Sequence, residues 1–175
     1  MRSREIAAGG TVRNWARNQA CVPVAVRRPS TTAEVARIVA DANRSGHRVK
    51  AFGAGHSFTA AAMTNGVLLS LDAMNVVERV DATADRVTVQ AGVRLRDLCD
   101  ELAAVGLTMP NLGDVNAQSI AGAINTATHG TGVDLGNLAT TIVGMELVTG
   151  RGDVVWCDST TRPDLLRVHP GAVEV

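Results

Sequence analysis

The sequence predicts an α+β fold, because short strand-like runs alternate with two amphipathic helical patterns in a chain of 175 residues. One helical pattern lies between two β-branched runs in the first third of the chain, and the other follows a series of short strands. Apolar residues make up 46% of the composition, enough for a hydrophobic core. We therefore expect a globular protein of mixed helices and strands.

The first third of the chain carries the clearest pattern. Residues 1–21 are polar and are expected to form a loosely structured N-terminal segment, followed by a short strand at 22–27. A helix is predicted over 31–46, because it opens with the capping box Thr31-x-x-Glu34 and repeats apolar residues at helical spacing. A strand at 48–52 follows, and this β–helix–β order predicts parallel strands on either side of the helix.

The later elements are weaker in pattern but regular in order. Strands are expected at three positions: 67–71, 76–81 and 86–91. A second helix is predicted over 94–105, with one apolar stripe and Gly106 at its end. Strand character then returns only at 142–149 and 154–157, joined by hairpin-turn residues at 150–153, and the C-terminal segment begins like a helix.

Charge and cysteine usage exclude several classes of function. Seventeen basic residues balance seventeen acidic ones, and the basic excess is scattered over residues 1–50, so we expect no nucleic-acid partner. Cys21, Cys99 and Cys157 lie far apart in no C-x-x-C pair, which predicts neither a disulfide framework nor a metal site. No apolar run reaches the ~18 residues of a transmembrane helix, and we expect a cytoplasmic protein.

The glycine-containing turn Gly53-Ala54-Gly55-His56-Ser57 follows the strand at 48–52. Glycines can take positive φ and let backbone N–H groups approach a phosphate. No helix pattern follows as a Rossmann fingerprint requires, and no Gly-Lys-Ser/Thr forms a P-loop. From the motif alone, an ordinary strand-to-loop turn and a nucleotide site remain equally open.

A second stretch, 111–132, is rich in glycine and small hydroxylic residues. Their density disfavours a packed helix and suits close backbone passage along a long polar ligand. The alternative is tight helix–sheet packing through small residues, chiefly at 121–123. A dinucleotide, with two phosphates and a long reach, would explain both stretches together.

Two histidines, His56 and His129, lie in these stretches. A lone histidine is usually a satisfied polar side chain, but its neighbourhood makes His56 a candidate to face a ligand. Neither residue has acidic or cysteine neighbours at metal-ligand spacing, so no metal is expected. The sequence has no Gly-x-Ser-x-Gly elbow, Cys–His pairing or close carboxylate pair for a hydrolase.

Three segments together resemble a known family: VKAFGAGHSFTAAAMTNGVLLSLDAMNVV, VTVQAGVRLRDLCDELAAVGLTMPNLGDVNAQSIAGAINTATHGTG and LATTIVGMELVTGRGDVVWC. They are similar to the FAD-binding domain of the aldonolactone oxidoreductases, which include L-gulonolactone oxidase and dehydrogenase, arabinonolactone oxidase and alditol oxidase. These belong to the vanillyl-alcohol-oxidase (PCMH-type) flavoprotein superfamily. The resemblance covers roughly residues 20–165.

The resemblance implies a PCMH-type α+β fold of two α/β subdomains that bind FAD, here 22–82 and 83–175, the second incomplete at its C-terminus. It assigns the turn around the pyrophosphate to Gly53, Ala54, Gly55 and Ser57. His56 matches the histidine that many relatives join covalently to the flavin 8α-methyl. The second FAD-contacting stretch is implied at Gly113, Asp114, Ser119, Gly122, Thr126, Ala127, Thr128 and His129.

The family activity implied is oxidation of a sugar lactone or polyol by hydride transfer to FAD, with oxygen or another acceptor reoxidising the flavin. Relatives continue into a cap domain that supplies most substrate-binding and acid/base residues. We therefore expect a truncated chain, with no catalytic residue assigned within it, and a separate chain could supply the cap. The alternatives are a non-catalytic FAD-binding module or remnant, and a related flavoenzyme of the same fold.

Overall fold

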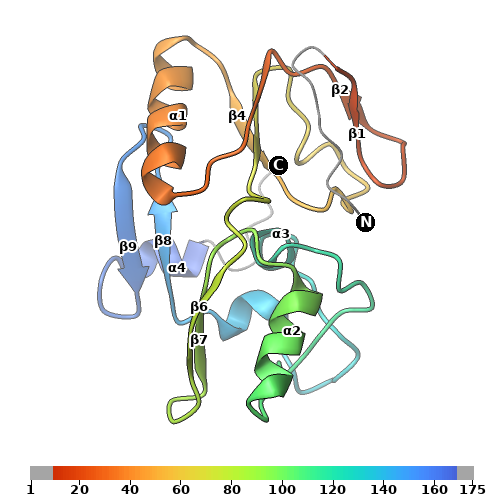
Figure 1. The fold of residues 1–175 in the computed structure, drawn as a ribbon, viewed down its shortest axis with the longest axis vertical. Helices are drawn as coiled ribbons and strands as arrows, with labels where there is room; N and C mark the ends of the chain where they lie inside the picture. The colour runs from red at the N-terminus through yellow and green to blue at the C-terminus, as the bar shows by residue number, and fades with distance from the viewer. Residues whose placement is uncertain (1–9, 169–175) are drawn as a thin grey trace. The chain divides into compact units, whose positions relative to one another are not determined.

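The protein is described by a computed structural model covering residues 10–168, which form two units (Figure 1). The first unit takes in residues 10–73 and 146–156, and the second takes in 74–145 and 157–168. Residues 1–9 of the predicted N-terminal segment and 169–175 of the C-terminal segment lie outside the described residues.

The first unit is built on a three-stranded parallel sheet in the order β3-β5-β4. Its strands are β3 (Ala25–Arg27), β4 (Val49–Phe52) and β5 (Val67–Ser70), and every residue of β5 is buried. The predicted parallel direction of the strands before and after the first helix is confirmed, but β5 lies between them. A continuous apolar run explains the central place of β5, because such a strand is shielded on both faces.

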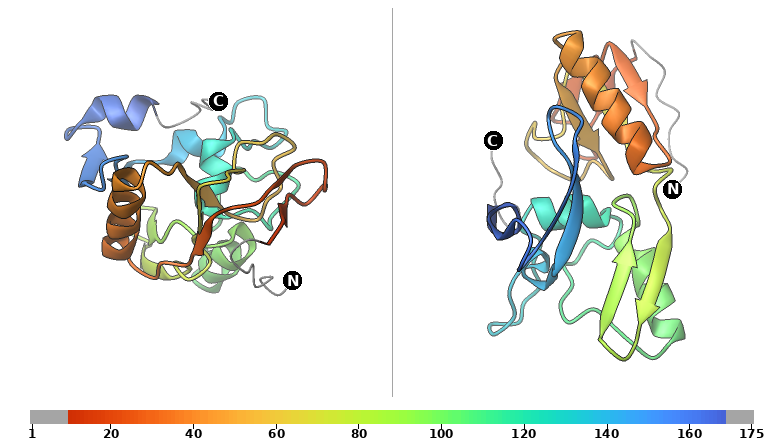
Figure 2. Two further views of the ribbon diagram at one scale, coloured as in Figure 1. Left: turned by 90° about the horizontal axis from the view of Figure 1, so that it is seen from above. Right: turned by 90° about the vertical axis from the view of Figure 1, so that its left-hand side faces the viewer.

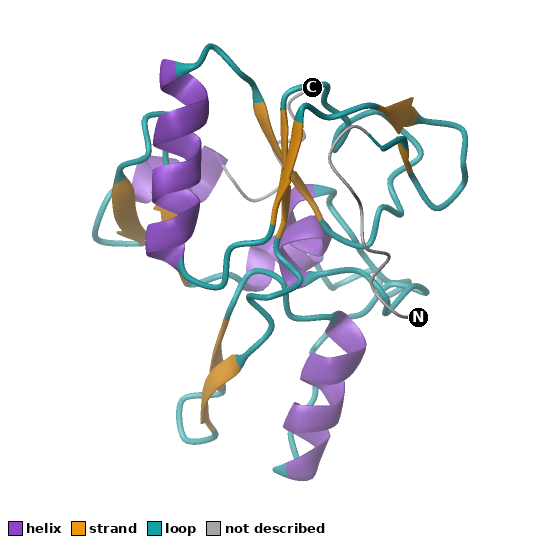
Figure 3. Cartoon of the chain, turned by 45° about the horizontal axis from the view of Figure 1, so that its top comes forward, coloured by secondary structure: helices purple, strands orange, loops and turns teal. Residues whose placement is uncertain are grey.

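Helix α1 (Thr32–Arg44) lies beside the strands of this sheet (Figure 3). Its predicted start is confirmed, because the Thr31 hydroxyl accepts the Glu34 N–H at 3.2 Å. The Glu34 carboxylate, however, reaches one residue further back than the usual capping box, to the N–H and hydroxyl of Ser30. The helix ends at Ser45, followed by Gly46 with a φ of +68°.

A short antiparallel pair, β1 (Val12–Arg13) and β2 (Ala20–Cys21), precedes the sheet. We predicted a loosely structured segment here, so this part of the prediction was wrong for residues 10–21. Val12 and Cys21 face each other across the pair and pack with Leu68 in the core of the first unit. Strands of two residues are too short to show an alternating pattern, so the sequence alone did not predict them.

The second unit contains an antiparallel ribbon and the helices α2, α3 and α4. The ribbon is β6 (Val77–Asp81) and β7 (Arg86–Val89), and it runs beside α2 (Leu95–Ala104) (Figure 2, right). The core of this unit is formed by seven buried residues: Val93, Leu95, Leu98, Leu102, Ile120, Ala123 and Leu138. Three residues of the predicted apolar stripe, Leu95, Leu98 and Leu102, are therefore buried, but the fourth, Val105, lies just beyond the helix and is exposed.

A third helix, α3 (Ile120–Asn125), corrects the sequence prediction, which disfavoured a helix in the small-residue stretch. Ala123 is fully buried, so the alternative of helix packing through small residues holds for this short segment. The turn η1 (Leu138–Thr141) follows it in the chain and packs against it. The rest of the stretch is irregular.

The remaining elements are the predicted hairpin and a short final helix. Strands β8 (Gly144–Val148) and β9 (Val154–Asp158) pair in a two-stranded sheet, and α4 covers Pro163–Val168. The hairpin turn is closed by the Thr149 N–H, which donates to the Asp153 carbonyl at 2.9 Å. Every helix within 10–168 is too short or too polar to cross a bilayer.

Candidate functional site

The glycine turn of the first unit begins where β4 ends. Gly55 has a φ of +70°, and a β-carbon on it would lie 2.8 Å from the Phe52 ring. This position therefore requires glycine for its backbone angle and for its space. No helix follows before β5, as the sequence predicted when it ruled out a Rossmann fingerprint.

The turn presents backbone donors, while several carbonyls in and beside it are already hydrogen-bonded. Within residues 10–168, the N–H groups of Ala54, Gly55 and Ser57 donate to no protein acceptor. The carbonyls of Gly55, Ser57 and Phe58, by contrast, all accept hydrogen bonds from the β1–β2 turn. Three N–H groups without protein acceptors in one short loop suit an anion, because backbone N–H groups carry partial positive charge.

His56 stands in the middle of this turn and is partly buried. Its imidazole stacks on the indole of Trp15, with ring centroids 5.2 Å apart and an interplanar angle of 23°. Sequence reasoning missed Trp15, although Asn14-Trp15 stands out in a polar segment with few aromatic residues. Nothing in the sequence pairs residues 41 positions apart (15 to 56), so this contact required the structure.

In the second unit, Ser119 begins α3. Its hydroxyl accepts the Gly122 N–H at 3.2 Å, and its own side chain is buried. At the other end of the helix, the Thr126 hydroxyl donates to the Gly122 carbonyl at 2.8 Å. Ala127 follows with a φ of +50°, an angle uncommon for a residue with a β-carbon. These predicted site residues thus shape the helix and the sharp turn that ends it.

That turn lies against residues 111–113. A β-carbon on Gly113 would lie 2.8 Å from Thr128 Cγ2 and 3.2 Å from the His129 carbonyl oxygen. One on Gly130 would lie 2.6 Å from the Leu112 carbonyl oxygen. The structure therefore brings Gly113 together with Thr128 and His129, whereas passage of this backbone along a ligand stays a prediction. Asp114 is exposed and projects from the same segment.

This second segment also has polar groups without protein partners. Among the described residues, the N–H groups of Gly113, His129 and Gly130 donate to no protein acceptor. The side-chain oxygen of Asn137 is buried and accepts no hydrogen bond from them. A buried amide oxygen without a donor is costly, so it is suited to a ligand that brings an N–H or O–H group. Sequence reasoning missed Asn137, which carries no distinguishing motif.

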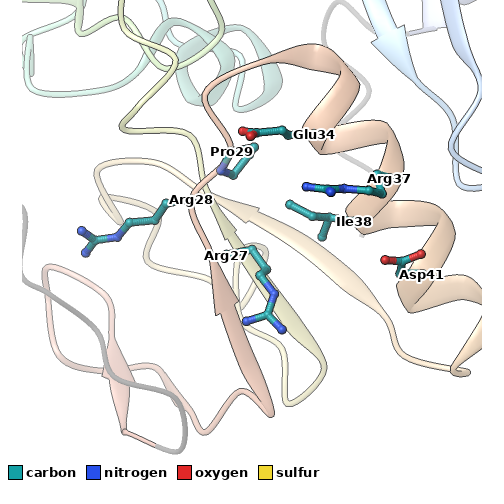
Figure 4. Close-up of a pocket in the computed structure, with 7 residues that line it drawn as sticks. All are labelled: Arg27, Arg28, Pro29, Glu34, Arg37, Ile38 and Asp41. Carbon is teal, nitrogen blue, oxygen red and sulfur yellow. The ribbon is translucent and has the colours of Figure 1, made fainter.

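A surface hollow of about 310 Å³ lies elsewhere, between β3 and α1 of the first unit (Figure 4). Its lining combines three arginines with two carboxylates and includes none of the predicted site residues. Arg28 points away from the helix, and Glu34 accepts a hydrogen bond from the Ser30 N–H.

Two side chains have shifted pKa values. Hydrogen bonds from Ser30 lower the pKa of Glu34, whereas burial raises the pKa of the Cys99 thiol in α2. Neither group belongs to the two candidate segments.

Metal-ligating side chains do not gather in the part of the chain that the structure describes. No group of three or more His, Cys, Asp or Glu residues within 10–168 is arranged to hold a metal ion. His129 instead places its Nδ1 2.8 Å from the Gly130 carbonyl oxygen, an interaction local to its own turn. Each of the two candidate segments therefore consists mainly of backbone groups and hydroxyls, and the first also contains the His56 imidazole.

A family model described as FAD binding domain matches residues 23–158. The L-gulono-1,4-lactone dehydrogenase of Mycobacterium tuberculosis is 46% identical over 162 residues, which cover 93% of this chain and 38% of that protein. The L-gulonolactone oxidase of Scyliorhinus torazame is 38% identical over 165 residues, with the same two coverages. The chain thus spans 38% of the length of these curated relatives.

Among solved structures, 6-hydroxy-D-nicotine oxidase from Arthrobacter nicotinovorans superposes with a TM-score of 0.75 at 26% sequence identity. The likeness covers 96% of this chain and 35% of that one. It confirms the predicted fold class, an α+β domain of the PCMH flavoprotein type.

Proposed function

We propose that this chain, which belongs to the FAD-binding domain family, holds FAD for the oxidation of a sugar lactone or alditol. FAD is the cofactor of the domain. The observation that carries the choice of substrate class is the 46% identity to a lactone dehydrogenase over 93% of the chain. The oxidation itself is proposed for the whole protein of which such a domain is a part.

The glycine turn of the first unit fits the diphosphate of FAD. Its N–H groups at Ala54, Gly55 and Ser57 have no protein acceptors and can donate to phosphate oxygens. Gly53 opens the turn and has no side chain of its own to block a ligand at that position. We assign these residues to the pyrophosphate because backbone N–H groups can bind a phosphate anion without help from a cationic side chain.

The segment from Gly113 to Asn137 fits a long polar ligand in a different way. The N–H groups of Gly113 and His129 offer donors, and the orphaned Asn137 oxygen offers an acceptor. FAD carries both phosphate oxygens and N–H and O–H groups, so it can meet both needs. Asp114, Ser119, Gly122, Thr126, Ala127 and Thr128 would shape or line this part of the site.

When bound, FAD supplies the acceptor for a hydride taken from a carbon that bears a hydroxyl group. The part played by these residues is to bind and orient the cofactor. We assign to His56 a place facing the flavin, where its imidazole is the candidate for covalent attachment. Oxygen or another acceptor would then reoxidise the flavin.

The test begins with the purified 175-residue chain and added FAD. Binding is followed by the change in flavin absorbance and fluorescence, and the complex is then denatured in acid and examined by in-gel fluorescence. We expect FAD to bind, and flavin to remain on the polypeptide after denaturation. His56→Ala should abolish the retained flavin, whereas the exposed His47→Ala should keep it.

The outcomes separate the parts of the proposal. A chain that binds no FAD would contradict the proposed function. Release of all flavin from the wild type would contradict attachment at His56 but not cofactor binding. Bleaching of the bound flavin by L-gulono-1,4-lactone would support the substrate class, while a bound flavin indifferent to lactones and alditols would support a non-catalytic FAD-binding module.

A further inference from the structure

The turn that joins β1 to β2 is rigidly built around one buried side chain. Asn14 is 4% exposed, its N–H donates to the Gln19 carbonyl at 3.2 Å, and its side-chain oxygen accepts the Gln19 N–H at 3.1 Å. The Arg17 N–H donates to the Asn14 carbonyl at 3.1 Å, and Arg17 takes a φ of +59°. Such a closed network holds residues 14–19 in one conformation.

This turn is bonded to the glycine turn on both sides of His56. The Trp15 N–H donates to the Gly55 carbonyl at 2.7 Å. The Asn14 side-chain amide donates to the Ser57 carbonyl at 2.9 Å, and that of Asn18 donates to the Phe58 carbonyl at 3.0 Å. The backbone on either side of His56 is therefore fixed, and the bonds use carbonyls while leaving the N–H groups of Ala54, Gly55 and Ser57 without protein acceptors.

The side chain of His56 is held by a separate contact. Its ring stacks on the Trp15 indole at 5.2 Å, while the Trp15 residue remains 58% exposed. An exposed tryptophan contributes little to a hydrophobic core, so stability of the core does not explain its position. Stacking restricts the rotation of an imidazole, since only one range of ring orientations keeps the two faces together.

We propose that Trp15 is a positioning residue for His56, and that residues 14–18 form a clamp which sets the orientation of the imidazole toward FAD. This proposal rests on the proposed function, because it takes FAD as the ligand of the glycine turn. The clamp acts before the cofactor arrives. It lowers the number of conformations that His56 and its neighbours lose on binding.

The first test measures the orientation of His56 without any cofactor. In the NMR spectrum, the imidazole C–H resonances of His56 should be displaced by the ring current of Trp15, and cross-relaxation peaks should join the two rings. Trp15→Leu should move the His56 resonances toward random-coil positions, whereas Trp15→Phe should retain most of the displacement. His47 serves as an internal reference that neither variant should move.

The second test measures the initial, reversible binding of FAD to the cofactor-free chain by fluorescence titration, before any covalent attachment. We expect Trp15→Leu to raise the dissociation constant about tenfold, because pre-organisation of the turn is lost. Trp15→Phe should stay close to wild type, and Trp156→Leu provides a matched control at the other tryptophan, which is 52% exposed and outside the candidate segments. Thermal unfolding checks that each variant is folded, and Asn18→Ala provides a milder lesion of the clamp with a smaller expected loss.

Two results would overturn the proposal in distinguishable ways. His56 resonances and FAD affinity unchanged in a folded Trp15→Leu variant would show that the clamp positions nothing, while the proposed function would stand. A wild-type chain that binds no FAD would overturn the proposed function and the cofactor part of this proposal, even if the NMR spectra confirmed the stacked rings.

Discussion

Gly113 and Thr128 lie so close that no side chain fits between them. A β-carbon on Gly113 would lie 2.8 Å from Thr128 Cγ2, well inside normal contact distance. Thr128 cannot simply rotate away, because its hydroxyl is bonded to the side-chain amide of Gln118 at 2.9 Å. This pair fixes how closely the segments around Gly113 and Thr128 pass each other.

Gly113→Ala should therefore destabilise the second unit. We expect a loss of about 1–2 kcal/mol in the free energy of unfolding, the usual cost of forcing one extra carbon into a filled space. The measurement is urea denaturation followed by circular dichroism. Gly150→Ala is the control, since a β-carbon there meets nothing within 4 Å.

The double variant Gly113→Ala with Thr128→Ser tests the cause. Serine lacks the Cγ2 methyl group but keeps the hydroxyl that bonds Gln118. Most of the lost stability should return, so the two substitutions should be non-additive. Additive losses would show that the methyl group is not what excludes a side chain at Gly113.

Gly130→Ala should be more damaging than Gly113→Ala. Here the added carbon would meet the backbone oxygen of Leu112 at 2.6 Å, and a carbonyl cannot change rotamer as a side chain can. We expect a loss of about 2–3 kcal/mol in the same assay, at the upper end of overpacking costs. A milder effect than that of Gly113→Ala would show that the segment at Leu112 shifts easily.

The fold was predictable where a long pattern was present. The capping box and apolar repeat located α1, whose observed bounds are Thr32–Arg44 against a predicted 31–46. The strands β4, β5, β6 and β7 were placed within two residues of their observed ends. Their β-branched residues and flanking turns are local signals, which can be recognised in the sequence without knowledge of the tertiary structure.

The misses came from short elements held by tertiary contacts. Strands β1 and β2 contain two residues each, and their turn is closed by the buried Asn14 rather than by an apolar pattern. Helix α3 left a detectable signal, since Ser119 precedes Ile120, Ala123 and Ile124 at helical spacing. The abundance of glycine and threonine around it outweighed that signal.

The candidate site was predictable as two segments but not as a set of contacts. Glycine density pointed to the stretches 53–57 and 111–132, because close backbone passage along a ligand needs residues without a β-carbon. Trp15 and Asn137 escaped prediction. One is brought to His56 from a distant part of the chain, and the other is distinguished only by burial without a donor.

Ser119→Ala should weaken α3. The Ser119 hydroxyl caps the helix by accepting the Gly122 N–H, and loss of such a cap costs about 1 kcal/mol of stability. Because Ser119 is buried, water cannot easily replace the lost acceptor. Chemical denaturation of the variant measures the loss, and Ser159→Ala, at an exposed position, is the matched control. Equal stabilities for the two variants would contradict a capping role.

Glu34 makes the stability of α1 depend on pH. Hydrogen bonds from the Ser30 N–H and hydroxyl hold the pKa of Glu34 below its usual range in the folded protein, with a smaller contribution from Arg37. A group whose pKa is lower when folded stabilises the fold above its unfolded pKa, and this contribution is lost as pH falls through the folded pKa. Glu34→Gln should therefore lower the melting temperature at pH 7, and the difference from wild type should shrink below roughly pH 4.

The control for this pH dependence is Glu101→Gln, which removes an equal charge from an exposed position in α2. A Glu34→Gln difference that stays constant from pH 7 to 3 would show that the protonated Glu34 side chain bonds Ser30 as well as the ionised carboxylate does.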